Sequence, residues 1–183
     1  MADFYFFRQI NQFAGRWAFL DNFGIFFAEY SGYVLLILLF TFLFHRKKKK
    51  EYKIMIAEAL FSAILARFVI TNIIRFIYFR PRPFVNYQVN LLLNHKMEGS
   101  FPSGHAAFFF ALSFAIYFFE KKAGILFLTI SLLMGLARIF VGIHYPSDIL
   151  GGIFVGMISA LLLNKYLRNH IQKFLFKASL PRG

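Results

Sequence analysis

The sequence contains no cysteine, so disulfide bonds and thiolate chemistry are both excluded. Charged residues are also scarce, because they make up 16% of the 183 residues, whereas soluble domains carry about 25%. Acidic residues are the rarest of these, with 8 Asp and Glu against 21 Lys and Arg. No internal repeat, low-complexity linker or secretory signal peptide is evident. The composition therefore argues against a soluble domain and against a disulfide-stabilised one.

Long apolar stretches dominate the sequence instead. Hydrophobic residues make up 59% of the chain, aromatic residues 21%, and the mean hydropathy is +0.60. A membrane-spanning helix needs about 20 mostly apolar residues. Five stretches approach this length, namely 24–44, 54–79, 103–119, 123–141 and 149–167. We therefore predict an all-α integral membrane protein, with five transmembrane helices packed as a bundle in a single domain of residues 1–183.

Residues 1–22 have a different pattern from these stretches. Phe4, Phe7 and Ile10 recur at helical spacing, with charged and amide residues between them. This pattern is typical of an amphipathic helix that lies in the membrane interface. The alternative is a short sixth span across the membrane.

The positive charges indicate how the protein sits in the membrane. Thirteen of the 21 Lys and Arg lie in the segment 45–53, at 121–122 and in the tail after residue 164. Five spans place these segments on one side, and cytoplasmic segments are enriched in Lys and Arg. We predict a multi-pass plasma-membrane protein with a basic cytoplasmic loop at 45–53 and an extracytoplasmic loop at 80–102. The basic residues are interpreted as a topology signal and a contact with anionic lipid, not as a nucleic-acid site.

Polar residues at the predicted outer side need another explanation, because ionisable residues near a membrane are costly and are usually functional. They fall in three segments, "RFIYFRPRPF", "FPSGH" and "ARIFVGIHYPSD", that are far apart in sequence. The predicted topology brings all three to the outer face. The residues concerned are Arg75, Arg80, Arg82, Ser103, Gly104, His105, Arg138, His144 and Asp148.

These residue types suit a phosphate or diphosphate group. A guanidinium presents a planar fork of donors that matches phosphate oxygens. The helix predicted to begin at "PSGH" offers free backbone N–H groups and the positive end of its dipole to an anion. Gly104 allows a close approach, and the Ser103 hydroxyl adds a donor, although Ser103 alone is equally well explained as a helix cap.

His144 and Asp148 are four residues apart, which places them on one face of a helix. Asp148 can then fix the tautomer of His144 and leave its other ring nitrogen free as a nucleophile. His105 comes from a different helix and suits a general acid that protonates the leaving oxygen. The alternative is a metal site, because all three side chains are possible metal ligands.

The remaining polar residues leave alternatives open. Arg80 supports the site from behind the phosphate-binding residues, or its side chain simply extends to the membrane interface. Glu29 pairs with an active-site arginine, or it makes a structural hydrogen bond. Arg67 lies in the middle of the second span and needs a partner inside the bundle that the sequence does not identify. His95 and Lys96 are interpreted as solvated loop residues.

Together, the three segments resemble the signature of the type 2 phosphatidic acid phosphatase superfamily, the lipid phosphate phosphatases. That signature reads Lys-x6-Arg-Pro, then Pro-Ser-Gly-His, then Ser-Arg-x5-His-x3-Asp. The chain has Arg75-x6-Arg82-Pro, an intact second part at 102–105 and the required spacing at 138–148. Two positions depart from the signature, because Arg75 replaces the lysine and Ala137 replaces the serine. The bulkier Arg75 is expected to rearrange one phosphate contact, and Ala137 removes one possible donor.

The resemblance implies a helical membrane enzyme that forms a phosphohistidine and needs no metal or other cofactor. It implies His144 as the nucleophile, Asp148 as the residue that orients it, and His105 as the acid. The residues that it implies for phosphate binding are Arg75, Arg82, Ser103, Gly104 and Arg138.

Small bacterial members of this superfamily include undecaprenyl-diphosphatases, phosphatidylglycerophosphate phosphatases and lipid A phosphatases. The chain looks most similar to the first, in its short length, its "RPRPF" and "GIHYPSD" segments and its predicted outward site. The expected reaction is hydrolysis of undecaprenyl diphosphate to undecaprenyl phosphate for carrier-lipid recycling. The other lipid phosphates, phosphatidate included, are alternatives, and so is a non-catalytic lipid-phosphate transporter. The sequence does not determine the oligomeric state.

Overall fold

The computed structural model describes residues 2–44 and 49–178, and these residues form helices and connecting loops without a β-strand. The prediction of an all-α fold is therefore confirmed for this part of the chain. The elements are α1 (Ala2–Asn11), α2 (Ala18–Ile25), η1 (Phe26–Tyr30), α3 (Ser31–Thr41), η2 (Phe42–Phe44), α4 (Lys49–Ile64), η3 (Leu65–Ile70), α5 (Thr71–Ile77), α6 (Pro83–Asn86), α7 (Gly104–Phe119), α8 (Lys121–Phe140) and α9 (Pro146–Ala178).

Four continuous helices are long and apolar enough to cross a membrane. They are Ala18–Phe44, which joins α2 to η2, Glu51–Ile77, which joins α4 to α5, Lys121–Phe140, and Pro146–Tyr166. The remaining predicted span, 103–119, corresponds to α7, which has only 16 residues. At 1.5 Å per residue it is about 24 Å long, less than the roughly 30 Å of a hydrocarbon core. The predicted count of five spans is therefore not confirmed, although the multi-pass character of the protein is.

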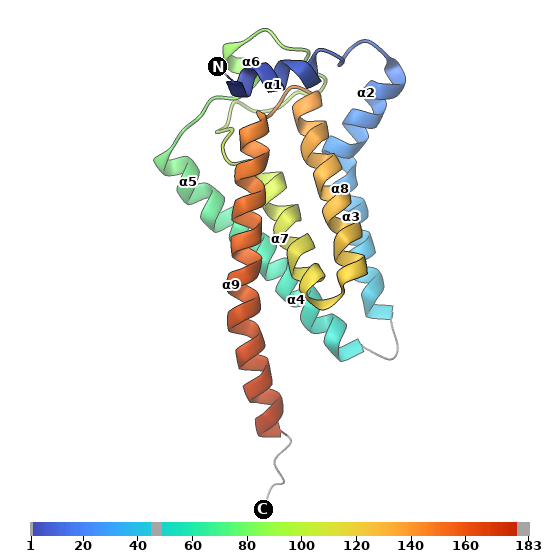
Figure 1. Ribbon diagram of the computed structural model, residues 1–183, viewed down its shortest axis with the longest axis vertical. Helices are drawn as coiled ribbons and strands as arrows, with labels where there is room; N and C mark the ends of the chain where they lie inside the picture. The colour runs from blue at the N-terminus through green and yellow to red at the C-terminus, as the bar shows by residue number, and fades with distance from the viewer. Residues whose placement is uncertain (1, 45–48, 179–183) are drawn as a thin grey trace, which may run out of the picture.

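The short helix α7 lies at the centre of the bundle, where it packs against α4, α8 and α9 (Figure 1). Small residues allow this close packing. A Cβ built on Gly156 of α9 would lie 2.7 Å from the backbone nitrogen of Ala111, and one on Gly152 would lie 2.8 Å from the carbonyl oxygen of Ser103. Such small-residue contacts let helix backbones approach each other in membranes. They hold the N-terminal end of α7 beside the first turns of α9.

Helix α1 lies across one end of the bundle rather than along it (Figure 1). Its ten residues are about 15 Å long, so α1 does not span a membrane. Phe7 is fully buried against Tyr145, whereas Tyr5 and Phe6 are exposed. The predicted N-terminal helix 1–22 is therefore divided: α1 ends at Asn11, and the first span begins at Ala18 instead of Gly24.

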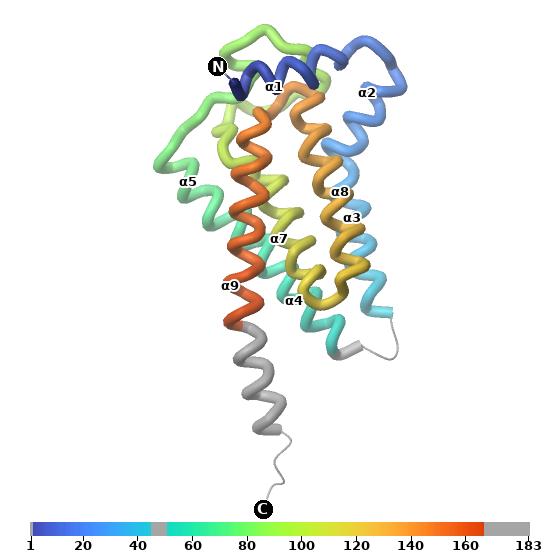
Figure 2. The backbone as a smooth tube through the Cα atoms, in the orientation of Figure 1, coloured from blue at the N-terminus to red at the C-terminus, as the bar shows by residue number. Residues whose placement is uncertain are grey.

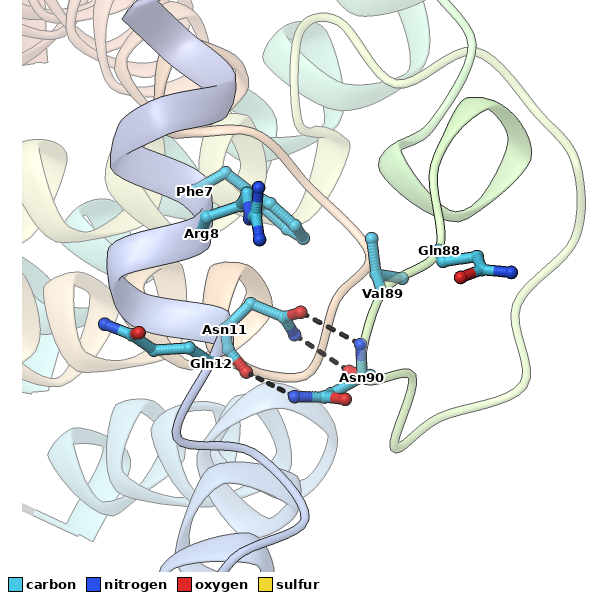
Figure 3. A pocket seen from close by; sticks show the side chains of 7 residues that line it. All are labelled: Phe7, Arg8, Asn11, Gln12, Gln88, Val89 and Asn90. Carbon is cyan, nitrogen blue, oxygen red and sulfur yellow. Dashed lines mark hydrogen bonds between the residues drawn. The ribbon is translucent and has the colours of Figure 1, made fainter.

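Paired amide side chains tie α1 to the long loop at 80–102 (Figure 3). The side-chain nitrogen of Asn11 donates to the carbonyl oxygens of Asn90 and Phe140, each at 2.8 Å. In return, the backbone N–H of Asn90 donates to Asn11 Oδ1 at 3.0 Å, and its side chain donates to the Asn11 carbonyl at 3.1 Å. These bonds fix the loop over the end of the bundle where the three polar segments meet.

The turn between α7 and α8, where α8 begins at Lys121, lies at the opposite end of the bundle from α1 (Figure 2). The start of α4 lies at the same end (Figure 1). The basic loop predicted at 45–53 is shorter than expected, because α4 begins at Lys49. Residues 45–48 of that loop lie outside the described residues.

Candidate active site

The three polar segments meet at the end of the bundle that α1 covers. The first contains Arg80-Pro81-Arg82-Pro83, and a residue before proline avoids the helical conformation. Arg82 is accordingly extended, with ψ of 159°, and α6 begins at the proline that follows it. The second segment is the start of α7, and the third is the turn between α8 and α9. The backbone N–H of Ser103 donates to the Asp148 carbonyl at 2.9 Å, which joins the starts of α7 and α9.

A glycine turn sets the position of His144. Gly142 has φ of +91°, which favours glycine, and a Cβ there would lie 2.8 Å from the carbonyl oxygen of Asn90. The chain turns at this point from α8 into α9. His144 therefore lies immediately before α9, and Asp148 lies in its first turn.

His144 and Asp148 form a buried pair, with exposed fractions of 1% and 0%. Nδ1 of His144 lies 3.3 Å from Asp148 Oδ2. The same oxygen accepts the backbone N–H of Tyr145 at 2.8 Å and the hydroxyl of Ser100 at 2.5 Å. Because Nδ1 faces a carboxylate, it carries the proton of the neutral ring, and Nε2 keeps its lone pair. Burial, followed by the nearby charges of Arg82 and Arg138, holds the pKa of His144 well below its usual value, so the ring is neutral at neutral pH.

Arg82 stands directly beside the free nitrogen of His144. Its Nη1 lies 3.2 Å from His144 Nε2 and donates to the carbonyl oxygen of Ile143 at 3.1 Å. Burial and the neighbouring charge of Arg75 lower the pKa of Arg82 to about 10, so the guanidinium is still positively charged at neutral pH. An anion that contacts His144 Nε2 would therefore also contact Arg82.

Three arginines at this site have buried donors that no atom of the described residues accepts. Arg75 donates from Nη2 to the Pro102 carbonyl at 2.9 Å, and Arg138 donates from Nη1 to the Ala28 carbonyl at 2.6 Å. The Nε atoms of Arg75, Arg82 and Arg138, however, are buried without a hydrogen-bond partner. A buried donor without a partner is costly, and a charged one more so. The arrangement is therefore complete only when an anion is bound.

The start of α7 combines a cap with a place for an anion. Ser103 is extended, and its Oγ accepts the backbone N–H of Ala106 at 3.4 Å. The other N–H groups of the first turn have no partner within the helix. Gly104 is also required by packing, because a Cβ there would lie 2.4 Å from Arg67 Nε. The capping interpretation of Ser103 and the anion-binding interpretation are thus compatible.

His105 is exposed to a cavity of about 200 Å³ beside Arg138. The cavity lies between η1 and the loop at 80–102, and its lining includes Glu29, Asn94 and His95. A second cavity of about 160 Å³ has four lining residues in common with the first, His105 and Glu29 among them. Its other walls are apolar, formed by Gly32, Leu36, Phe109 and Met134. A polar space beside His105 therefore continues into an apolar one inside the bundle.

Two residues beside this cavity, His95 and Glu29, bear on earlier expectations. His95 is not a freely solvated loop residue: it lines the cavity with His105, and burial together with Arg82 and Arg138 lowers the pKa of His95 to about 4. Glu29 lines the same cavity as Arg138, and its charge acts on that arginine, although its carboxylate forms no ion pair within the described part of the chain. The pairing of Glu29 with an active-site arginine stays a prediction.

Arg80 does not extend to the interface but binds the catalytic candidate Asp148 from behind. Its Nη1 donates to Asp148 Oδ1 at 3.0 Å and to Ser147 Oγ at 2.6 Å, and its Nη2 donates to Asp3 Oδ2 at 2.6 Å. The guanidinium also lies 3.9 Å from the ring centre of Tyr145. Asp3 in turn accepts the backbone N–H of Ser147 at 3.0 Å and its hydroxyl at 2.5 Å.

Sequence reasoning missed Asp3 and Ser100, although both contact this network. Asp3 is the only acidic residue of α1, and Ser100 lies two residues before the "PSGH" segment. These positions in the sequence only weakly indicated that either residue belongs to the site. Among the described side chains of residues 2–44 and 51–166, no group of three or more His, Asp or Glu is arranged to hold a metal ion.

Comparisons with known proteins identify the family of this chain. Residues 56–172 match the PAP2 superfamily. The chain is 36% identical to the undecaprenyl-diphosphatase BcrC of Bacillus subtilis (strain 168) over 151 residues, which cover 80% of this chain and 75% of that protein. It is 33% identical to the bacitracin transport permease protein BcrC of Bacillus licheniformis, over 86% of this chain and 76% of that one. The crystal structure of Aquifex aeolicus LpxE matches with a TM-score of 0.75 at 29% identity, over 91% of this chain and 96% of that one.

Proposed function

This chain belongs to the PAP2 superfamily and is a membrane-bound lipid phosphatase, and we propose that it hydrolyses undecaprenyl diphosphate at the outer face of the membrane. The products are undecaprenyl phosphate and inorganic phosphate. The observation that carries this proposal is the set of buried, unpartnered Nε donors on Arg75, Arg82 and Arg138, next to a neutral histidine. Three guanidiniums without acceptors suit a phosphoryl group that is about to react.

In the proposed first step, Nε2 of His144 attacks the terminal phosphorus atom. The bond from this phosphorus to the bridging oxygen breaks, and His105 gives that oxygen a proton as undecaprenyl phosphate leaves. Asp148 keeps the Nδ1 proton of His144 in place and stabilises the positive ring that forms. The arginines stabilise the charge on the phosphoryl oxygens, in a site that excludes most water.

In the second step, a water molecule hydrolyses the phosphohistidine. His105, now without its proton, takes a proton from the water as its oxygen attacks phosphorus, and the bond between phosphorus and Nε2 breaks. Inorganic phosphate leaves, and both histidines return to their starting states. His105 serves this role from the cavity wall, and the phosphoryl group would lie between it and His144.

Two observations support a lipid diphosphate at an outward-facing site. The polar cavity beside His105 continues into the apolar cavity at Leu36, Phe109 and Met134, which suits a headgroup followed by a hydrocarbon tail. Lys121 and Lys122 follow the turn between α7 and α8, at the end of the bundle opposite the site, and basic segments usually face the cytoplasm. Undecaprenyl diphosphate is also the substrate in the name of the B. subtilis relative.

A substrate panel tests the proposal. The purified full-length protein in detergent should release phosphate from undecaprenyl diphosphate with a kcat/KM at least about tenfold above that for phosphatidylglycerophosphate or lipid A. A His144→Gln variant is the control for contaminating phosphatase, and excess chelator should leave the activity unchanged. Preference for either other lipid would contradict the substrate, and full activity of the His144→Gln variant would contradict the mechanism.

Transport of a lipid phosphate is the second candidate, because one relative carries the name of a transport permease. A transporter needs the arginines but not a nucleophile. It would move substrate between the two leaflets of a vesicle without releasing phosphate, and it would retain this activity in the His144→Gln variant.

A further inference from the structure

Arg67 places a positive charge in the middle of an apolar span, where its Cζ lies 5.5 Å from the ring centre of its neighbour Phe68. It belongs to η3, a π-helical turn in the middle of the Glu51–Ile77 span. Such turns widen a helix locally, redirect its side chains and occur often at functional sites. A charged residue within a span is costly unless it has a partner or a function. Arg67 forms no ion pair with a carboxylate of residues 2–44 or 51–166.

The side chain of Arg67 lies against the start of α7. A Cβ built on Gly104 would lie 2.4 Å from Arg67 Nε and 2.7 Å from Cζ. Gly104 precedes His105 directly, so the guanidinium of Arg67 flanks the helix end that carries the free N–H groups. The missing side chain at Gly104 is therefore what allows Arg67 to reach the site.

The charge of Arg67 adds to a cluster in which the guanidiniums outnumber the nearby carboxylates Glu29, Glu98 and Asp148. Arg75, Arg82 and Arg138 share this region, and burial, Arg75 and then Arg67 lower the pKa of Arg82. Asp148 is already bound by Arg80 and Ser100. Three guanidiniums suffice for one phosphoryl group with its three outer oxygens, so a fourth indicates a larger anion.

We infer that Arg67 binds the second, lipid-proximal phosphate of a diphosphate and so selects diphosphates over monophosphates. The inference rests on the proposed function and adds a residue that the three-part signature does not contain. Arg67 precedes Arg75 by eight residues on one continuous helix, so its backbone lies farther from the end of the bundle that α1 covers. Its guanidinium lies against Gly104, whereas Arg75 binds the Pro102 carbonyl two residues earlier. We place the lipid-attached phosphate on the side of Arg67, toward the interior of the bundle. There Arg67 stabilises the negative charge that the leaving group gains when the bridging bond breaks.

The test compares two substrates with the same tail, farnesyl diphosphate and farnesyl phosphate, in wild type and in Arg67→Met. Methionine keeps an unbranched apolar side chain in the span but removes the charge. We expect kcat/KM for the diphosphate to fall about 100-fold, as for the loss of one charge-stabilising donor. We expect less than about a fivefold change for the monophosphate, and an Arg67→Lys variant should regain part of the loss. Where turnover of the monophosphate is too slow to measure, its inhibition constant replaces kcat/KM.

The control is Arg16→Met, because Arg16 is exposed and stacks only on Phe13 outside the site. It should leave both substrates unaffected. An equal loss on the two substrates, or no loss on either, would overturn the role of Arg67. If Arg67→Met fails to fold, as judged by thermal unfolding, the test uses Arg67→Lys instead. The deciding quantity is then the loss of kcat/KM on the diphosphate relative to the loss on the monophosphate. Wild type that hydrolyses neither farnesyl substrate nor undecaprenyl diphosphate would instead refute the proposed function, and the inference with it.

Discussion

Replacing Asp3 by asparagine should slow the reaction, although Asp3 belongs to α1 and lies outside the phosphate pocket. Asp3 accepts a hydrogen bond from Arg80 at 2.6 Å, and Arg80 donates in turn to Asp148 at 3.0 Å. Asparagine keeps the size of the side chain and can still accept the N–H of Ser147. It removes the charge that holds Arg80 in its present orientation. Asp3 is therefore a positioning residue for the carboxylate that orients His144.

The size of the effect follows from this charged contact. A hydrogen bond to a charged group contributes about 1.5–3 kcal/mol. The side chains of Arg80 and Asp3 are 22% and 27% exposed, so solvent screening favours the lower value, about 1.5 kcal/mol. Since about 1.4 kcal/mol in the barrier changes a rate tenfold, we expect Asp3→Asn to lower kcat about tenfold. KM should change less than about twofold, because no substrate contact is lost.

Phosphate release from the lipid diphosphate measures both constants. Asp21→Asn is the matched control, because Asp21 also accepts a backbone N–H, from Gly15 at 2.9 Å, but contacts no arginine in the described residues. A double-mutant cycle with Arg80→Gln should give a coupling energy of about 1.5 kcal/mol. A change confined to KM, or additive effects of the two substitutions, would refute the role assigned to Asp3.

Two further predictions concern pH and packing. Because burial and the arginines lower the pKa of His144, the nucleophile stays neutral as the pH falls through 6.5. We therefore expect kcat/KM to show no loss centred at the usual histidine pKa. A loss of kcat/KM near pH 6.5 that persists when each of the other histidines is replaced would contradict this. Gly156→Ala should lower the melting temperature by several degrees, since its Cβ would lie 2.7 Å from the backbone of Ala111, whereas Gly15→Ala, with no atom within 4 Å, should be affected only through its φ of +79°.

The sequence predicted the catalytic candidates well, because their spacing carries the information. His144 and Asp148 lie four apart at a helix start, and the "PSGH" segment begins another helix. The predicted second span ended at residue 79, and the structure ends α5 two residues earlier, at Ile77. Each of these signals is local in the chain, so no tertiary information was needed.

Other features depended on contacts between distant residues. Asp3 and Arg80 are 77 positions apart, and neither lies in a pattern that indicates the other. The predicted stretch 103–119 matches α7 to within one residue, but its central place in the bundle was not predictable, since an apolar run has the same composition whether lipid or other helices surround it. The burial of Ala107, Ala111 and Ala115 comes from packing against α4, α8 and α9. The π-helical turn at Arg67 is likewise a property of the packed bundle.

The central claim is that His144 carries the phosphoryl group between the two steps. The direct measurement uses undecaprenyl diphosphate labelled with ³²P in its terminal phosphate, mixed rapidly with the purified protein and quenched with alkali, which preserves phosphohistidine. Peptide mapping should find the label on His144 in the wild type and no label in a His144→Gln variant. In a His105→Gln variant, which activates water slowly, the labelled protein should persist for longer. Label on another residue, or turnover by wild type with no labelled protein at any time, would contradict the account.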